Sequence, residues 1–578
     1  MSNSKNSENN NSIPIIEEMN VQTERDNFEK ELKAKFNKNV INKNFEGINE
    51  TKILGWENKL YESKLNIRDF SNVSDADILN EEFNDAKSKR IIKGDIERTR
   101  VHESIYMKSF KDYAYQLIIY YCNKNNISYK QGLNEIVGPF ILLKYKLSIT
   151  FSTIYGMLVC FIDKFLTNYY HETEFFSLKS SLSLINLLLR YHEPELFDRF
   201  EYSLITADLY ATSWILTLFA NKFNLGVIYH LWDKLILFDD NLFPHFFITA
   251  YLIKNKKKFF EVDCTIILSV LSQLHIDTIE EVNDVLDFAA ELKDNTPNSF
   301  YLLANKLEIF KYNSPNIKKL FEEYNVDKML AIPMFPSDIL NITYKDIIGC
   351  PDENCENFLL RKHQFNNSQK CIYCRIKSIK SQLFYIIFDL RIFRDENSNN
   401  NNKNNRNESI IFSKSFPGFL PKTITITKNE LNDKNFPKNI LSEYKNDKDN
   451  THFIIITSET NYFNQYEEDY YKLKDRRGSK IGIFFKGYKE LDISKANELI
   501  KKTRKSKNYT LLKEFDNFKK LISEMNKERF KNVSFVYGGF KNIHSYCKKY
   551  NIELLEHGEQ CTLCQEKNSI ISSILKIW

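Results

Sequence analysis

The spacing of apolar residues changes once along this chain, near Pro333, and that change constrains the fold more than any other feature. From residue 50 to about 330, apolar residues recur every three or four positions, as in 106–121 and 214–223, which is the period of packed helices. After Pro333 the apolar runs are short and continuous, as in 382–389 and 452–457. Runs of this kind are typical of strands buried on both faces. The sequence therefore predicts an all-α domain followed by an α/β domain.

The remaining stretches are polar or irregular. Residues 1–48 are Asn-rich and have no sustained period, so we expect a disordered leader. Residues 396–409, with the run NSNNNNKNNRNES, interrupt the second domain as a low-complexity insertion expected on its surface. We assign residues 331–374 to a linker that contains cysteines, and residues 565–578 to a C-terminal tail.

Composition excludes several classes of protein. Lys and Arg total 81 against 76 Asp and Glu, a net charge of +5 over 578 residues, which argues against a chain built to bind nucleic acid. No apolar run approaches the ~18 residues of a membrane span, and residues 1–13 lack the apolar core of a signal peptide. Without export, the ten cysteines are expected to be reduced thiols or metal ligands. We expect a cytoplasmic protein.

Two short motifs in the helical half carry polar side chains suited to chemistry. Asp95 and Arg98 lie three residues apart, so on one helical turn the carboxylate can orient the guanidinium. Gln131 precedes Gly132, which permits an unusual turn or a close approach of the backbone. Taken singly, the pair could be a solvated ion pair and the glutamine a surface amide.

Together these motifs resemble a known family. Ile-x-x-Asp-x-x-Arg at residues 92–98, followed by Tyr-x-Gln-Gly at 129–132, is similar to the two signature motifs of TBC-domain Rab GTPase-activating proteins. Further similar pieces follow the family's order: Trp56, residues 192–196, 214–220 and 231–233. The resemblance covers about half of the chain and implies an all-α TBC domain over residues 50–330. Trp214, Trp232 and Tyr210 are expected in its core, because their neighbours have helical apolar spacing.

The resemblance also implies a mechanism. An arginine supplied in trans stabilises the charge that develops on phosphate oxygens during GTP hydrolysis, and the family supplies a glutamine as well. By this resemblance Arg98 is the arginine finger, Gln131 is the glutamine finger and Asp95 orients Arg98. The partner would be a GTP-bound Rab-family GTPase, to which GTP and Mg²⁺ belong. The chain would then be an activator in vesicle trafficking rather than an enzyme itself, and it would need no cofactor for chemistry.

One departure from the family pattern keeps an alternative open. The family usually continues Arg-Thr-Phe-Pro, whereas this chain has Arg100 and Val101 after Thr99. The alternative is a catalytically weak scaffold or tether that recruits trafficking partners. In either case we expect peripheral association with Golgi or endosomal membranes.

The second half resembles rhodanese-like domains over about residues 375–564. The run ending Asp389-Leu-Arg391 is similar to a strand and Asp-x-Arg turn of that fold, and Gly538-Gly539 is similar to its last turn. A TBC domain followed by a rhodanese-like domain recurs in a branch that includes TBC kinase-like proteins. Catalysis in this fold needs a cysteine in the loop after the central strand. Residues 457–462 contain none, so we expect this half to be inactive.

The cysteines and a basic segment complete the candidate features. Two Cys-x-x-Cys knuckles flank the rhodanese-like unit, and Cys371, Cys374, Cys561 and Cys564 together could form a closed structural zinc site. A rival set uses Cys350 and Cys355 with the first knuckle, and free thiols are a third interpretation. Residues 472–507 are rich in Lys and Arg, which indicates either a solvated face or a binding surface for anionic lipid heads or an acidic partner.

Overall fold

The computed structural model describes eleven parts of the chain, and every structural statement below concerns these residues. They are residues 48–62, 73–82, 86–99, 108–147, 149–344, 355, 383–392, 418–459, 507–558, 561 and 563–564. The Asn-rich leader up to residue 47, the insertion 396–409, the basic segment 472–506 and the tail 565–578 lie outside them.

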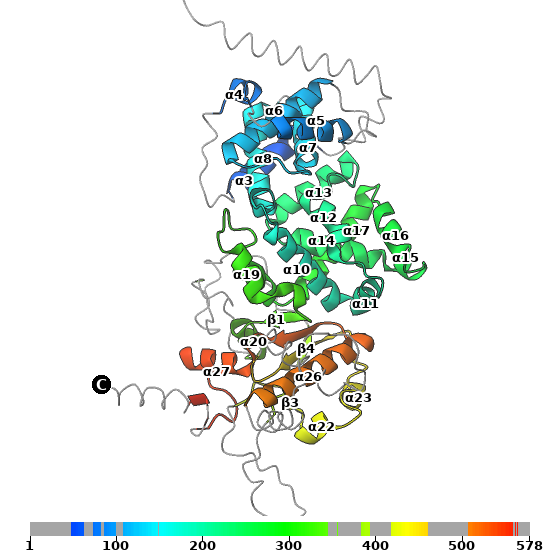
Figure 1. The fold of residues 1–578 in the computed structure, drawn as a ribbon, viewed down its shortest axis with the longest axis vertical. Helices are drawn as coiled ribbons and strands as arrows, with labels where there is room; N and C mark the ends of the chain where they lie inside the picture. The colour runs from blue at the N-terminus through cyan, green and yellow to red at the C-terminus, as the bar shows by residue number, and fades with distance from the viewer. Residues whose placement is uncertain are drawn as a thin grey trace, which may run out of the picture. The chain divides into compact units, whose positions relative to one another are not determined.

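The region from residue 50 to 328 is helical, as the spacing of its apolar residues predicts. Its elements, drawn in Figure 1, are α3 (Glu50–Glu62), α4 (Asp75–Leu79), α5 (Ala86–Arg98), α6 (Lys108–Asn125), α7 (Leu133–Leu147), α8 (Phe151–Phe165), α9 (Thr167–His171), α10 (Phe176–His192), α11 (Pro194–Tyr202), α12 (Ala207–Leu216), α13 (Leu225–Phe238), α14 (Phe243–Lys254), α15 (Lys256–Phe260), α16 (Ile267–Gln273), α17 (Ile279–Asp294), α18 (Ser299–Lys306), α19 (Ile317–Tyr324) and the 3₁₀ turn η2 (Val326–Lys328).

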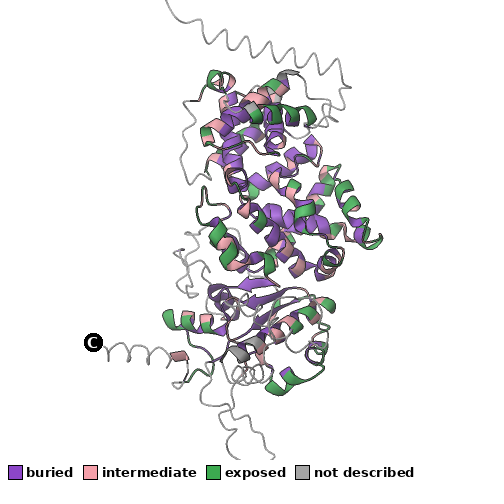
Figure 2. Ribbon diagram, in the orientation of Figure 1, coloured by how far each residue is buried: buried purple, intermediate pink, exposed green. Residues whose placement is uncertain are grey.

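The core of the helical region is formed by helices whose sequences are apolar on nearly every side. In α14 every residue from Phe243 to Leu252 is buried, and Figure 2 shows this helix almost wholly in the colour of buried residues. Trp214, Trp232 and Tyr210 are buried, which confirms their predicted place in the core. The indole N–H of Trp232 donates to the carbonyl of Leu218 at 3.0 Å, so its polar edge is satisfied inside the core.

After residue 331 the chain forms one five-stranded sheet with the strand order β1-β5-β4-β2-β3, in which every pairing is parallel. The strands are β1 (Ile332–Met334), β2 (Phe384–Asp389), β3 (Thr423–Thr425), β4 (Thr451–Ile456) and β5 (Val533–Val536). The helices are α20 (Pro336–Thr343), α22 (Lys428–Asn432), α23 (Lys438–Ser442), α26 (Lys507–Lys527) and α27 (Gly539–Lys549). Residues 332–343, assigned above to a linker, thus form β1 and α20.

Side chains alternate between the two faces of this sheet. Phe453 and Ile455 of β4 pack with α22, α23 and α26 on one face, whereas Ile454 and Ile456 pack with α20 and α27 on the other. All six residues of β4 are buried as a result, which explains the continuous apolar run from Phe453 to Ile456. The prediction of a helical region followed by an α/β region is confirmed, and the sheet of the second region is parallel throughout.

The chain divides into two compact units whose boundaries do not follow the change of fold class alone. The first unit holds Met1–Asn186, Phe200–Lys293 and Ala304–Asp327. The second holds Lys328–Trp578 together with Leu187–Arg199 and Asp294–Leu303 from the helical region. Within the second unit the N–H of Asn532 donates to the carbonyl of Tyr191 at 2.8 Å, and the N–H of Ser299 donates to Asp338 Oδ2 at 2.6 Å. No described helix is long and apolar enough to cross a membrane.

Candidate functional site

Asp95 and Arg98 form an ion pair at the C-terminal end of α5. The guanidinium Nη2 of Arg98 donates to Asp95 Oδ1 at 2.6 Å. The Asp95 side chain is 5% exposed, whereas that of Arg98 is 76% exposed. A buried acceptor therefore restrains a guanidinium that remains almost entirely in solvent, which leaves most of its donors directed away from the protein.

Tyr129 connects this pair to the segment that carries Gln131. The Tyr129 hydroxyl lies 2.9 Å from Asp95 Oδ2 and 3.0 Å from Asn134 Oδ1. Burial raises the pKa of Tyr129 above its usual value, and the charge of Asp95 raises it further. The phenol therefore stays protonated at physiological pH and serves as a donor beside the Asp95 carboxylate.

Asn134 closes the network on the side of Gln131. Its Oδ1 accepts the backbone N–H of Gly132 at 3.0 Å, and its Nδ2 donates to Thr99 Oγ1 at 2.6 Å. The hydroxyl of Thr99 in turn donates to the carbonyl of Asp95 at 2.8 Å. Hydrogen bonds thus join the end of α5 to the turn before α7, and they hold the two motifs together although these lie 34 residues apart at Asp95 and Tyr129.

Gln131 is exposed at this turn. The next residue, Gly132, has φ +106°, in the region that favours glycine. Lys130 anchors the turn on its other side, because its ammonium donates to the carbonyls of Tyr169 and Glu172. The structure therefore places both predicted finger side chains in solvent, each beside a buried network. Asn134, Thr99 and Lys130 were not predicted from the sequence to belong to the site. An Asn two residues after a turn glycine was a usable signal for the first.

Replacing Gly132 by alanine is expected to lower the free energy of unfolding by about 1–2 kcal/mol, because a β-carbon is strained at this positive φ. That atom would also lie 3.3 Å from the Tyr170 hydroxyl and 3.4 Å from Thr217 Cγ2. Gly94→Ala in α5 is the matched control, since nothing lies within 4 Å of its β-carbon position. It should raise stability by about 0.5–1 kcal/mol. Urea unfolding of the full chain measures both, and a Gly132→Ala variant as stable as wild type would contradict the expectation.

In the second unit, residues 457–459, which directly follow β4, contact charged side chains from α26 and α27. Glu459 accepts from the ammonium of Lys541 at 3.0 Å, and Gly539 packs so closely that a β-carbon there would lie 2.6 Å from the carbonyl oxygen of Thr457. Beneath this loop, Glu514 Oε2 accepts from the N–H of Ser458 at 2.8 Å and its Oε1 accepts from the N–H of Ile392 at 2.9 Å. These contacts hold residues 457–459, the part of this segment that the structure describes, in place.

Glu514 is expected to make the second unit less stable as pH rises from about 4.5 to 7. Burial raises the pKa of Glu514 from 4.5 to about 7, so in this window the folded chain holds a proton that the unfolded chain has released. The free energy of unfolding should fall by about 3 kcal/mol across the window. Urea unfolding at pH 5 and 8 measures the change. Glu514→Gln should remove most of the dependence of the free energy of unfolding on pH, whereas Glu443→Gln, at an exposed position, should not. If both variants depend on pH as the wild type does, Glu514 is not the responsible group.

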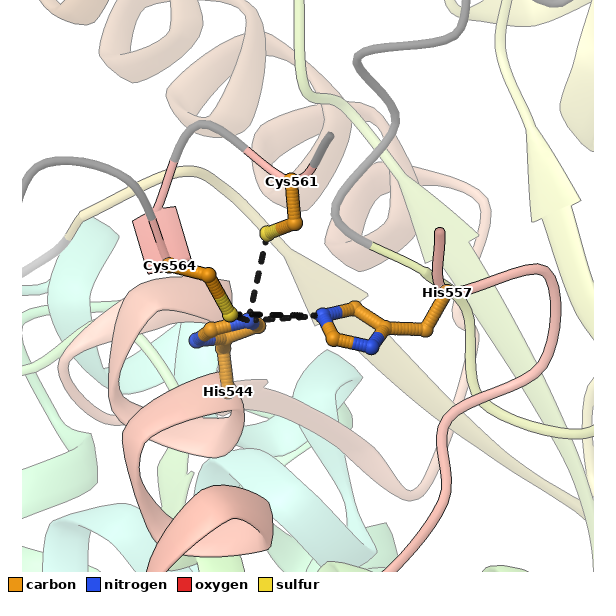
Figure 3. Close-up of side chains that lie close together, drawn as sticks. All are labelled: His544, His557, Cys561 and Cys564. Atoms are coloured by element: carbon orange, nitrogen blue, oxygen red, sulfur yellow. Dashed lines mark hydrogen bonds between the residues drawn. The ribbon is translucent and has the colours of Figure 1, made fainter. Parts of the chain in front are cut away.

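The predicted metal ligands are described in part. Cys561 and Cys564 lie beside His544 and His557, and the four ligand atoms are within 4.8 Å of one another (Figure 3). Cys371 and Cys374 lie outside the described residues. The same holds for Cys350 of the rival set, whose Cys355 is buried. The two histidines were not among the predicted ligands, although His557 lies only four residues before Cys561.

Comparison with known proteins identifies the helical region. Residues 52–260 match the family model of the Rab-GTPase-TBC domain. A TBC domain therefore occupies this part of the chain, as the motifs predict. A TBC domain-containing protein kinase-like protein of Homo sapiens is 31% identical over 112 residues, which are 19% of this chain and 12% of the relative.

Two further similarities were found. The GTPase activating protein Gyp51 of Schizosaccharomyces pombe is 25% identical over 209 residues, 35% of this chain and 19% of that protein. The solved Chlamydomonas flagellar RabGAP TBC domain is 15% identical with a TM-score of 0.34, and the alignment covers 48% of this chain and 92% of that one. The chain thus spans less than a fifth of the length of either curated relative. The rhodanese-like identity of the second unit stays a prediction.

Proposed function

We propose that this chain is a GTPase-activating protein for a small GTPase of the Rab family, with Arg98 and Gln131 supplied in trans to the GTP of the partner. The observation that carries the proposal is the hydrogen-bonded network that joins the end of α5 to the turn at Gly132, inside the segment that matches the TBC family model. It holds an exposed arginine and an exposed glutamine on one connected framework, and catalysis in trans requires that arrangement.

The chemistry follows from the properties of these side chains. During phosphoryl transfer, negative charge develops on the phosphate oxygens, and a guanidinium stabilises it by donating two hydrogen bonds at once. Asp95 accepts from one nitrogen of Arg98 and limits the directions that the side chain can take before the partner binds. The Gln131 amide would orient the attacking water. The nucleotide and its Mg²⁺ belong to the GTPase, so this chain needs no cofactor for the reaction.

The second unit supports a binding role beside this activity. We propose a catalytically inactive rhodanese-like domain, on the basis of its parallel sheet with helices on both faces and the Asp389-Leu-Arg391 turn at the end of β2. The segment 457–459 after β4 carries the Glu459–Lys541 ion pair and no cysteine, and a carboxylate held in an ion pair does not supply the thiolate nucleophile that the reaction of this fold requires. This unit would recruit the protein to vesicle-trafficking partners on Golgi or endosomal membranes.

Single-turnover GTP hydrolysis with a panel of GTP-loaded Rab proteins tests the proposal. The full chain should accelerate hydrolysis by at least one Rab, and the double variant Arg98→Ala/Gln131→Ala should not. Binding of the same Rabs is measured in parallel. If some Rabs bind but none is accelerated, the chain is a scaffold and its exposed arginine and glutamine do no chemistry.

A further inference from the structure

Four side chains of types that bind metals lie close together near the C-terminal end of the second unit. His544 lies on α27, His557 lies in the segment that follows this helix, and Cys561 and Cys564 belong to the knuckle beyond it (Figure 3). His544 and Cys561 are buried, Cys564 is half-buried and His557 is exposed. The cluster is separate from the finger residues, which belong to the first unit.

Hydrogen bonding alone does not account for this arrangement. The Nε2 atom of His544 lies 3.0 Å from Nε2 of His557, 3.2 Å from Sγ of Cys561 and 3.5 Å from Sγ of Cys564. An imidazole nitrogen carries either one proton or one lone pair. It can therefore make one good hydrogen bond, and not three. Atoms that surround a shared centre show these mutual distances without bonding to one another.

The distances fit a tetrahedral zinc ion. With zinc bonds of about 2.0–2.1 Å to nitrogen and 2.3 Å to sulfur, neighbouring ligand atoms of a tetrahedron are about 3.3–3.8 Å apart. Four of the six separations run from 3.0 Å between the two Nε2 atoms to 3.8 Å between Cys564 Sγ and His557 Nε2. All six are within 4.8 Å, so the four atoms surround a space of about the size that one zinc ion needs.

We propose that His544, His557, Cys561 and Cys564 bind one zinc ion in a closed structural site. Two thiolates and two imidazoles suit zinc, whereas Ca²⁺ and Mg²⁺ require oxygen ligands. Four protein ligands leave no position for a substrate, so the ion would stabilise the fold rather than catalyse a reaction. Ligand binding by the two cysteines releases their protons.

The position of the site indicates what the ion would hold in place. The segment that carries His557 forms an isolated antiparallel bridge, in which Phe419 and Leu555 exchange hydrogen bonds of 2.8 and 3.0 Å. A β-carbon at Gly418 would lie 3.2 Å from Cβ of His557. Zinc would therefore fasten this segment to α27 and stabilise the isolated bridge between Phe419 and Leu555.

The test is zinc affinity of the full chain, measured by competition with a chromophoric chelator, together with the zinc content of the purified protein. His557→Ala is the informative variant, because this histidine is exposed and its loss should not unfold the protein. Wild type should bind about one zinc per chain. His557→Ala should bind it at least about 10-fold more weakly, and Cys561→Ser/Cys564→Ser should bind none.

Cys371→Ser/Cys374→Ser is the matched control, because it removes a second Cys-x-x-Cys knuckle and should leave the affinity unchanged. Loss of zinc in this variant with normal binding by His557→Ala would overturn the proposal in favour of four cysteine ligands. A wild-type chain that neither contains nor binds zinc would also overturn it. Cobalt substitution gives a second readout that needs no variant, since its sulfur-to-metal absorption should correspond to two thiolates and not four.

Discussion

Arg98→Ala is expected to reduce the acceleration of GTP hydrolysis by about 10³-fold or more, on any Rab that the wild-type chain activates. The reason is that an alanine side chain supplies no positive charge to the phosphate oxygens. Arg98→Lys should recover little of the rate, because an ammonium cannot bridge two oxygens. Single-turnover hydrolysis at saturating activator measures the chemical step directly.

Arg90→Ala is the matched control for this series. Arg90 is exposed on the same helix as Arg98 and has the same charge, so its loss tests a general electrostatic effect. It should leave the rate within a few-fold of wild type.

Gln131→Ala should slow hydrolysis strongly without weakening the binding of GTP-loaded Rab. If Arg90→Ala and Arg98→Ala reduce the rate equally, Arg98 acts through charge at a distance and is no finger.

The second large effect concerns the buried ion pair at the end of β2. Arg391 donates from Nε to Asp389 Oδ1 and from Nη2 to Asp389 Oδ2, at 2.9 and 2.6 Å. Its Nη2 also donates to the carbonyl of Gly418 at 3.1 Å, and its guanidinium lies 3.7 Å from the ring centroid of Phe540. Both side chains are less than 5% exposed. The pair thus ties β2 to the segment before β3 and to α27.

Arg391→Ala should lower the free energy of unfolding of the second unit by about 3–5 kcal/mol, because it leaves the Asp389 carboxylate buried without its partner. Arg529→Ala is the control: Arg529 is exposed and its ion-pair partner Glu195 is only partly buried, so the loss of this pair should cost less than about 1 kcal/mol. Urea unfolding measures both. Asp389→Leu/Arg391→Met removes both charges and should be less destabilised than Arg391→Ala; the reverse order would contradict this account.

The fold was predictable wherever burial determines the apolar pattern. The apolar runs in the sequences of β2, β4 and β5 are continuous because each of these strands packs against side chains on both faces of the sheet. The edge strands were missed. Pro333 was interpreted as a boundary, yet it is the central residue of β1, where an edge strand tolerates a missing N–H. The three residues of β3 are half-buried and give no comparable apolar signal.

The site was predictable to the extent that its contacts are local. The ion pair of Asp95 with Arg98 follows from a spacing of three residues on a helix. The hydrogen bond from Tyr129 to Asp95 does not, since it depends on how α5 packs beside the turn before α7. The histidines of the proposed zinc site were missed for the same reason. His544 reaches Cys561 through the packing of α27 against the segment that follows it.

The second unit contains segments from two separate parts of the sequence, and this affects where the chain can be divided. Residues 187–199 and 294–303 lie within the helical part of the sequence, yet they belong to the compact unit that contains the sheet. In that unit the Tyr191 carbonyl accepts from the N–H of Asn532, and the Ser299 N–H donates to Asp338. A single cut near residue 330 would strip the sheet of both segments and leave those partners facing water. A transfer of the sheet to another chain would therefore have to include residues 187–199 and 294–303 as well.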